Sequence, residues 1–318
     1  MKTTAPKRDH GGGIDAAIAR FGGTRDDWVD LSTGINPVPY PLGEIPAEAW
    51  TALPDQAAME RLLNAARAFW NVPDTAHIIA APGASALIAT MPALSAGDEV
   101  YIPTPTYNEH AAAFSARGFH VWDDPAVPTH VYVHPNNPDG RLWPASVMGD
   151  RGLTVIDESF CDVTPEASHV ALTAKPRIVV LKSFGKFWGL AGLRLGFAIG
   201  HPETLSTLPD RLGPWPVSGP ALEIGARALS APAWAETTRT RLAKDAARLD
   251  ALVTAAGARL VGGTPLFRTY SVPGGAQHLH EKLAQAHILT RVFPYADDWI
   301  RFGLPGDAAA WSRLEATL

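Results

Sequence analysis

The sequence predicts an α/β protein with a mostly parallel sheet covered by helices on both faces, followed by a smaller α+β unit. Short apolar runs recur between helical patterns. In these runs apolar and polar residues do not alternate, as they would in a strand with one solvent-exposed face. Continuous apolar runs are typical of a buried parallel sheet. After Pro216 the pattern changes to long helices followed by short strands, which predicts the smaller unit. The 318 residues suffice for one large or two modest domains.

The spacing of apolar residues predicts the individual elements. Helical spacing over residues 55–70 predicts a helix that Asp55 caps. Buried strands are expected at 99–103, 131–134, 153–157 and 178–181, with a helix over 108–117 between the first two. In the second unit we expect helices at 219–229, 233–255 and 277–286, and strands near 266–272, 288–293 and 299–303. The predicted organisation is an N-terminal arm over 1–30 that borders the active site, a large domain over 31–210, and a small domain over 211–318.

One uncharged stretch, residues 78–97, is long enough to suggest a transmembrane helix. Pro82, Gly83 and Ser85 interrupt it, so it predicts instead a strand, a tight turn and a buried helix. No membrane partner is expected from this stretch.

The charge and cysteine content restrict the class of protein. The 27 Lys and Arg residues against 32 Asp and Glu give a net charge of −5, which argues against nucleic acid or acidic membranes as partners. A single cysteine, Cys161, excludes an internal disulfide and fits a reducing compartment. The first residues lack the apolar core of a signal peptide. We therefore expect a cytoplasmic enzyme, with no metal site.

Polar residues after the expected strands are the first candidates for a site, because open parallel sheets bind ligands beyond the carboxyl ends of their strands. Lys186 follows the strand at 178–181 and lies among Phe184, Phe187 and Trp188. Burial depresses the pKa of a lysine and makes it an amine nucleophile, although a surface lysine on a loop is the alternative. Asp157 ends the strand at 153–157 and could hold a cation, a metal or a ring nitrogen, or only cap the loop.

Two further signals point to the same edge of the sheet. The rigid turn at 134–140 presents the amides of Asn136 and Asn137. Residues 82–85 run into a helix whose free N–H groups could cradle a phosphate, an ordinary capped helix being the alternative. Together the cradle, the amide turn, the carboxylate and the lysine could enclose one anionic cofactor that carries a ring.

These motifs resemble the fold type I family of pyridoxal-phosphate enzymes, which is aminotransferase-like. The resemblance rests on HPNNPDG, VIDE and SFGKFWGLAGLRLGF in this order, and on Ser183 and Lys186 followed by Arg194 eight residues after the lysine. It implies the fold of that family, pyridoxal 5'-phosphate as the cofactor, and a homodimer with the site at its interface.

The resemblance also implies roles for individual residues. Lys186 is similar to the lysine that binds the cofactor covalently, and Asp157 to the carboxylate that pairs with the pyridine nitrogen; these two are the implied catalytic residues. Asn137 is similar to the asparagine that bonds the cofactor's 3′ oxygen, and Tyr107 to the aromatic residue that stacks on its ring, with a core tyrosine as the alternative. The implied phosphate site consists of Gly83, Ala84, Ser85, Ser183 and Arg194.

Segments near the ends of the chain narrow the resemblance to the threonine-phosphate decarboxylase group of cobalamin biosynthesis. HGGG, STGINP and PWPVS carry it. It implies that L-threonine O-3-phosphate, a small phosphorylated amino acid, is converted to (R)-1-aminopropan-2-ol phosphate. Arg301, His10 and Asn36 are the implied substrate-binding residues; a surface arginine and a plain N-terminal tail are the alternatives for the first two. An aminotransferase of the histidinol-phosphate type is the main alternative, and a non-catalytic binding protein with an inherited fold is a remote one.

Among the departures from the aminotransferase pattern, two concern side chains that contact the cofactor in relatives. Phe160 stands where many aminotransferases have a tyrosine that bonds the 3′ oxygen, so that bond is not expected. Leu53 stands where relatives often have a tyrosine that reaches the cofactor phosphate of the neighbouring subunit.

Overall fold

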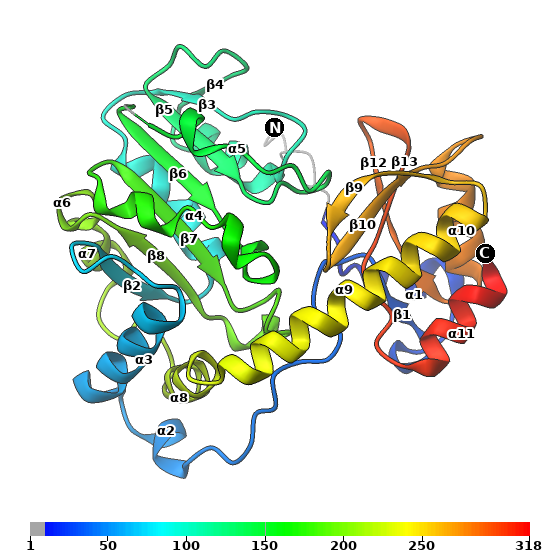
Figure 1. The fold of residues 1–318 in the computed structure, drawn as a ribbon, viewed down its shortest axis with the longest axis horizontal. Helices are drawn as coiled ribbons and strands as arrows, with labels where there is room; N and C mark the ends of the chain where they lie inside the picture. The colour runs from blue at the N-terminus through cyan, green and yellow to red at the C-terminus, as the bar shows by residue number, and fades with distance from the viewer. Residues whose placement is uncertain (1–9, 150) are drawn as a thin grey trace, which may run out of the picture.

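The computed structural model describes residues 10–149 and 151–318, and its larger body is a seven-stranded sheet between helices (Figure 1). From edge to edge the strands are β2 (His77–Ala81), β8 (Gly196–Gly200), β7 (Ile178–Ser183), β6 (Leu153–Asp157), β5 (Thr129–Val133), β3 (Glu99–Tyr101) and β4 (His120–Trp122). Every neighbouring pair from β7 to β4 is parallel, whereas β8 is antiparallel to both β2 and β7. The predicted mostly parallel sheet is confirmed.

Helices cover both faces of this sheet, as predicted. They are α3 (Gln56–Phe69), α4 (Ala84–Thr90), α5 (Asn108–Ser115) and α8 (Gly219–Leu229). Side chains alternate between the faces of a strand. Along β6, Val155 joins the apolar layer that contains Leu87 of α4 and Phe114 of α5, whereas Ile156 joins the layer that contains Leu62 of α3.

Local signals in the sequence fix several element boundaries. The carboxylate of Asp55 accepts a hydrogen bond of 2.7 Å from the N–H of Ala58, which caps α3 where the sequence predicts it. The stretch 78–97 forms β2, α4 and η2 (Met91–Leu94), as predicted. Within residues 10–149 and 151–318, no helix is both long and apolar enough to cross a membrane.

The smaller unit is built on a four-stranded antiparallel sheet. Its strands run in the order β12 (Arg291–Phe293), β13 (Ala296–Phe302), β10 (Phe267–Ser271) and β9 (Arg259–Thr264), and α9 (Pro232–Ala255), α10 (Ala276–Gln285) and α11 (Ala308–Thr317) accompany them. The N-terminal segment joins this unit, because β1 (Val29–Asp30) pairs with β11 (Ile288–Leu289), and Ile14 of α1 (Ile14–Phe21) packs in one cluster with Leu289.

The shorter elements lie mostly in the connections. They are α2 (Ala47–Thr51), α6 (Pro202–Leu205), α7 (Leu208–Leu212), η1 (Arg25–Asp27), η3 (Ala145–Val147), η4 (Cys161–Val163), η5 (Pro165–Ala167), η6 (Val170–Ala174) and η7 (Ala191–Leu193).

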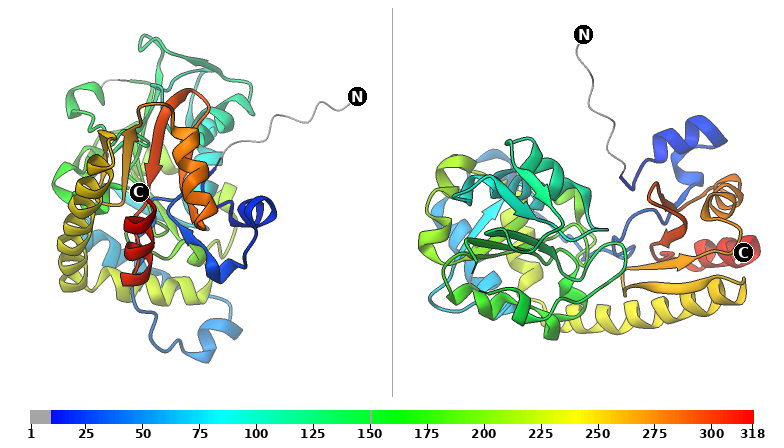
Figure 2. Two further views of the ribbon diagram at one scale, coloured as in Figure 1. Left: turned by 90° about the vertical axis from the view of Figure 1, so that its right-hand side faces the viewer. Right: turned by 90° about the horizontal axis from the view of Figure 1, so that it is seen from above.

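The packing of α8 bears on where one body ends and the other begins. A Cβ on Gly225 of α8 would lie 2.8 Å from Leu62 of α3, so this glycine lets the two helices approach closely. The next helix, α9, has 24 residues and runs from the large body to the smaller one (Figures 1 and 2). We propose that the large body extends through α8, and that residues 14–30 belong with the smaller unit, in place of a division at residue 210.

Strand β8 is not predicted by the sequence, because the glycines of GFAIG are typical of a loop. The structure explains these glycines by close packing. A Cβ on Gly196 would lie 2.4 Å from the backbone nitrogen of Ala84, so only glycine lets this strand pass the start of α4.

Candidate active site

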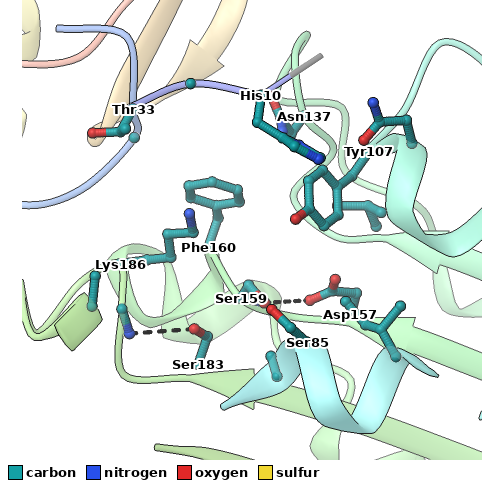
Figure 3. A pocket seen from close by; sticks show the side chains of 18 of the residues that line it. His10, Thr33, Ser85, Tyr107, Asn137, Asp157, Ser159, Phe160, Ser183 and Lys186 are labelled. Atoms are coloured by element: carbon teal, nitrogen blue, oxygen red, sulfur yellow. Dashed lines mark hydrogen bonds between the residues drawn. The ribbon is translucent and has the colours of Figure 1, made fainter. Parts of the chain in front are cut away.

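A cavity of about 430 Å³ lies beyond the carboxyl ends of β5, β6 and β7, and side chains from both bodies line it (Figure 3). The predicted site residues that line it are His10, Gly83, Ala84, Ser85, Tyr107, Asn137, Asp157, Ser183, Lys186, Arg194 and Arg301. Asn36 is the predicted site residue that does not. The structure thus brings the strand-end candidates together at one place.

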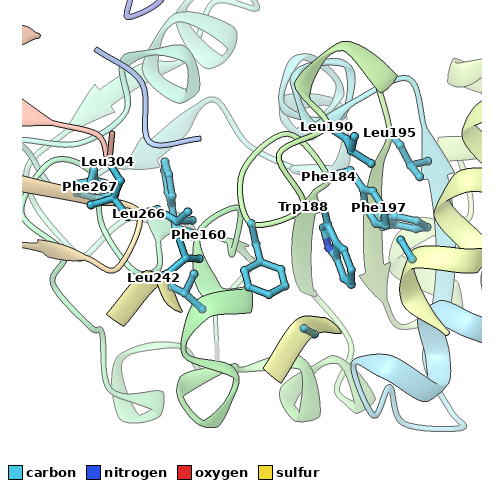
Figure 4. Close-up of a cluster of buried hydrophobic side chains, with 14 of the residues drawn as sticks. Phe160, Phe184, Trp188, Leu190, Leu195, Phe197, Leu242, Leu266, Phe267 and Leu304 are labelled. Carbon is cyan, nitrogen blue, oxygen red and sulfur yellow. The ribbon is translucent and has the colours of Figure 1, made fainter. Parts of the chain in front are cut away.

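The loop that carries Lys186 is held from two directions. The carbonyl of Lys186 accepts hydrogen bonds from the N–H groups of Asn36, at 3.0 Å, and Gly189, at 3.1 Å. Beside it, the rings of Phe184 and Trp188 are stacked with centroids 5.1 Å apart (Figure 4). The lysine therefore sits on a loop whose backbone is anchored in the core.

The amine of Lys186 has the character of a nucleophile. Its Nζ lies 5.2 Å from the ring centre of Phe160. Burial, together with the nearby Arg301 and Arg194, lowers the pKa of this amine to about 8, although Asp157 acts in the opposite direction. A substantial fraction of the amine is consequently neutral close to physiological pH.

The lowered pKa predicts how Lys186 reacts with an amine-directed label in the cofactor-free protein. Only the neutral amine reacts, so the labelling rate should rise with pH through a midpoint near 8. It should level off above about pH 9, one unit beyond the midpoint. Peptide-resolved mass spectrometry measures this, with the exposed Lys175 as the reference peptide. A midpoint above pH 10 would contradict the buried setting.

Asp157 ends β6 and is 2% exposed. One carboxylate oxygen lies 2.8 Å from Nε2 of His110, and the other accepts hydrogen bonds from the N–H and hydroxyl of Ser159. Burial alone would raise the pKa of Asp157, but the bonds from His110 and Ser159 lower it below its ordinary value. The carboxylate is therefore an anion at the floor of the cavity. It also caps the local turn through the N–H and hydroxyl of Ser159.

The start of α4 and the guanidinium of Arg194 lie together at one end of the cavity. Gly83 has a φ of +88°, and a Cβ there would lie 2.7 Å from Nη2 of Arg194. The first N–H groups of a helix have no partner within it. Ser183 adds a hydroxyl that accepts a hydrogen bond from the N–H of Gly185 at 3.3 Å. Glycine, guanidinium and N–H donors at one end of the cavity suit a phosphate group.

Two arginines meet at the end of the cavity next to the smaller unit. Arg301 of β13 is 6% exposed and donates to the side-chain oxygen of Asn137 and, at 2.6 Å, to the carbonyl of Ser32. Its Nε has no partner among the described residues. Arg291 of β12 stands directly opposite Arg301 in the strand register and also lines the cavity. Burial, and then Arg291, lower the pKa of Arg301 to about 10.

Of the two remaining predicted substrate-binding residues, His10 lines the cavity and Asn36 does not. His10 lies at the cavity, with Nε2 3.0 Å from the carboxylate of Glu109 and its ring centroid 6.4 Å from that of Tyr107. Asn36 is 1% exposed, and its amide donates to the carbonyl of Phe187. Its side-chain oxygen accepts a bond from Arg241 of α9. The structure therefore places Asn36 under the lysine loop and outside the lining of the cavity, where the predicted contact with a substrate is not available.

Sequence reasoning misses several residues of this site. His110 had a usable signal, since it lies one helical turn after Tyr107 in YNEH and therefore on the same face. Ser159 also had one, because a serine two residues after an aspartate is typical of a local turn. Arg291 and Tyr295, which line the cavity, had none, because only the pairing of β12 with β13 brings them there.

Comparison with known proteins identifies one family and two full-length relatives. A family model described as Aminotransferase class I and II matches residues 28–125 and 131–313. The chain is 40% identical over 326 residues to the threonine-phosphate decarboxylase of Sinorhizobium sp, covering 97% of each chain. It is 37% identical over 327 residues to the threonine-phosphate decarboxylase of Pseudomonas aeruginosa, covering 98% of this chain and 97% of that one.

A solved structure is similar in fold. The histidinol-phosphate aminotransferase of Sinorhizobium meliloti, in complex with pyridoxal-5'-phosphate, matches with a TM-score of 0.82. The match covers 99% of this chain and 96% of that one at 18% identity, so the likeness is one of fold.

Proposed function

The chain belongs to the class I and II aminotransferase family, and from this premise we propose that it decarboxylates L-threonine O-3-phosphate to (R)-1-aminopropan-2-ol phosphate. The names of the two full-length relatives support the reaction. In that reaction Cα loses carbon dioxide and gains one proton. The pathway such a product serves is cobalamin biosynthesis.

Pyridoxal phosphate is the cofactor of this family, and the residues of the cavity fit it. Lys186 offers a buried amine for its aldehyde, and Asp157 a buried anion for its pyridine nitrogen. Gly83 leaves room beside Arg194 that a Cβ would fill, which suits the phosphate. Phe160 presents a ring and no hydroxyl, and we propose the amide of Asn137, which lines the cavity, for the 3′ oxygen.

The proposed substrate class, a doubly anionic amino acid, is argued from the pair of arginines at the end of the cavity next to the smaller unit. Arg291 and Arg301 face each other across β12 and β13, and like charges in that position destabilise a sheet. An anionic ligand between them relieves the repulsion. A substrate with a carboxylate and a phosphate supplies one anionic group for each guanidinium. Arg291 lines the cavity directly opposite Arg301, and we propose it for the substrate phosphate.

The protein's own groups perform the proton steps. When bound, pyridoxal phosphate supplies an electron sink for the bonding pair that decarboxylation leaves behind. Asp157 holds a proton at the pyridine nitrogen and so keeps that sink effective. Lys186, with a pKa of about 8, can give a proton to Cα and take one up near neutral pH. The orientation of the substrate's carboxylate, which we assign to Arg301, would decide whether the carboxylate or the hydrogen leaves Cα.

The test of the reaction supplies threonine phosphate without any keto acid and measures carbon dioxide. We expect many turnovers per enzyme molecule. An aminotransferase would stop after one half-reaction and resume only with 2-oxoglutarate. Keto-acid-dependent turnover of histidinol phosphate without release of carbon dioxide would overturn the proposal in favour of the aminotransferase alternative.

Arg291→Gln should weaken substrate binding more than it slows the chemical step. A hydrogen bond to a charged group contributes about 1.5–3 kcal/mol, so KM for threonine phosphate should rise roughly ten- to a hundredfold. Steady-state kinetics measures the change, with kcat expected to fall much less. Arg259→Gln, on exposed strand β9 of the same sheet, is the matched control and should leave KM unchanged. An unchanged KM in the Arg291 variant would remove this residue from the substrate site.

We propose further that the protein is a homodimer. Large apolar side chains are exposed in the segment around α2, with Trp50 and Leu53 each 67% exposed, and at Trp215 just before α8. Monomers seldom expose such groups together, and a second copy would cover them. Light scattering on a sizing column should give twice the mass of one chain, and Trp50→Lys should shift it toward the monomer. A wild-type monomer at micromolar concentration would contradict the proposal.

A further inference from the structure

Behind the cavity lies a buried ion cluster that the proposed reaction does not use. It consists of Lys182, Glu158 and Asp162, which are 2%, 1% and 3% exposed. Nζ of Lys182 lies 2.7 Å from Oε2 of Glu158 and 3.4 Å from Oδ1 of Asp162. We call these three residues the ion cluster.

Strand alternation places the ion cluster back to back with the active site. On β7, Lys182 and Ser183 are consecutive and point to opposite faces of the sheet. Glu158 likewise follows Asp157, and its N–H donates to the carbonyl of Leu181 at 2.9 Å, so the sheet register continues past β6. Each strand therefore carries one residue of the site and one residue of the ion cluster in adjacent positions.

The carboxylates of the ion cluster have further donors from distant parts of the chain. Glu158 accepts bonds from the hydroxyl of Ser168 at 2.7 Å and the N–H of His169 at 2.5 Å. The two oxygens of Asp162 accept bonds from the indole N–H groups of Trp70, at 2.9 Å, and Trp188, at 3.1 Å. Trp188 lies two residues after Lys186, so the ion cluster also reaches the lysine loop.

Lys182 and Glu158 are ionised in spite of their burial. Burial alone would lower the pKa of Lys182, but Glu158 and Asp162 raise it above its ordinary value. Lys182 in turn offsets burial and keeps the pKa of Glu158 low. Buried ion pairs often stabilise a fold no better than packed apolar residues of the same volume. The ion cluster lies between the lysine loop and the two strands, β6 and β7, that carry Asp157 and Ser183. This position suggests a role other than stabilising the fold.

We propose that Lys182 is a positioning residue for the active site. By joining Glu158 to Asp162 behind the sheet, it fixes the ends of β6 and β7 and the lysine loop. It thereby sets the position of Lys186 relative to Asp157. Lys182 is not among the residues that line the cavity. Its effect reaches the cavity through Glu158 beside Asp157, and through Trp188 beside Lys186. Arg239 of α9 adds a tie to the long helix, since its Nε donates to the carbonyl of Asp162 at 2.8 Å.

The test reads the state of Lys186 in the cofactor-free full-length protein and needs no substrate. Lys182→Met removes the charge and keeps the length of the side chain. The loosened loop should admit water to Lys186, whose amine also faces Arg301, Asp157 and Arg194. The labelling midpoint of Lys186 should then rise by about one pH unit, so that labelling at pH 8 falls roughly fivefold. Lys182→Arg retains the charge and should restore the wild-type midpoint.

Arg268→Met is the matched control. It breaks the ion pair between Arg268 and Asp250, at 2.7 Å, in the smaller unit and away from the cavity. It should lower the unfolding temperature and leave the Lys186 midpoint unchanged. If Lys182→Met does not fold, Trp70→Phe replaces it, because it removes one donor to Asp162 without touching the cavity. This variant should shift the midpoint in the same direction by a smaller amount.

A folded Lys182→Met or Trp70→Phe protein with the wild-type midpoint would overturn the proposal. An equal shift in Arg268→Met would also overturn it, since the effect would then follow from general loss of stability. Because the assay contains no substrate, these outcomes are independent of whether the enzyme proves to be a decarboxylase or an aminotransferase.

Discussion

Lys186→Ala is expected to lose nearly all turnover while the protein still binds its cofactor. The variant removes the amine that joins the cofactor and the group that moves the proton at Cα. A positioned proton-transfer group alone contributes roughly 10²–10⁴-fold, so we expect kcat to fall by at least about a thousandfold. The phosphate cradle, with Gly83 and Arg194, is untouched and should keep cofactor affinity measurable.

The measurement combines carbon dioxide release with borohydride reduction, which fixes the cofactor to the lysine that holds it. In the wild type, the reduced adduct should map to the peptide that contains Lys186. Lys175→Ala, an exposed lysine in the same body, is the control and should behave as the wild type. An adduct on any other lysine would refute the assignment of Lys186.

The parts of the site that could be predicted are those encoded within a few residues. Asp157 and Lys186 follow apolar strands, and the end of a parallel strand is where a sheet binds ligands. The cap of α3 is equally local, because Asp55 and Ala58 are three residues apart. Such signals need no knowledge of how distant segments pack.

The parts that could not be predicted depend on contacts between distant segments. The side chain of Asn36 is turned under the lysine loop by Arg241, which is 205 positions away in the sequence. Arg291 reaches the cavity because β12 pairs with β13 in a register that puts it opposite Arg301. The glycine at 196 looks like part of a loop until the start of α4 is placed against it. In each case a tertiary contact decides the role of the residue.

The ion cluster could not be predicted from the sequence either, because its partners are also brought together by the fold. Lys182 precedes Ser183 in a strand whose other residues are apolar, and the sequence contains no local partner for its charge. Its partners, Glu158 and Asp162, come from the neighbouring strand and the turn that follows it. Only the order of strands in the sheet makes a buried lysine tolerable at this position.

Asp157→Asn is expected to leave the covalent attachment of the cofactor intact but to slow turnover strongly. Asparagine has nearly the same shape, and its oxygen can still accept the bonds from Ser159. A neutral amide, however, cannot hold a proton at the pyridine nitrogen, so the electron sink weakens. Removal of one preorganised electrostatic group typically costs about 10²–10³-fold in kcat, and we expect a loss of at least that size.

The matched control is Ser159→Ala, which removes one bond to Asp157 but leaves its charge in place. This variant should be slowed far less than Asp157→Asn, with both rates measured as carbon dioxide release from threonine phosphate. If Asp157→Asn stays within about threefold of the wild type, the barrier has changed by less than 1 kcal/mol. Asp157 would then serve only as the cap of its turn. The negative charge of its carboxylate, which His110 and Ser159 stabilise, would have no part in the chemistry.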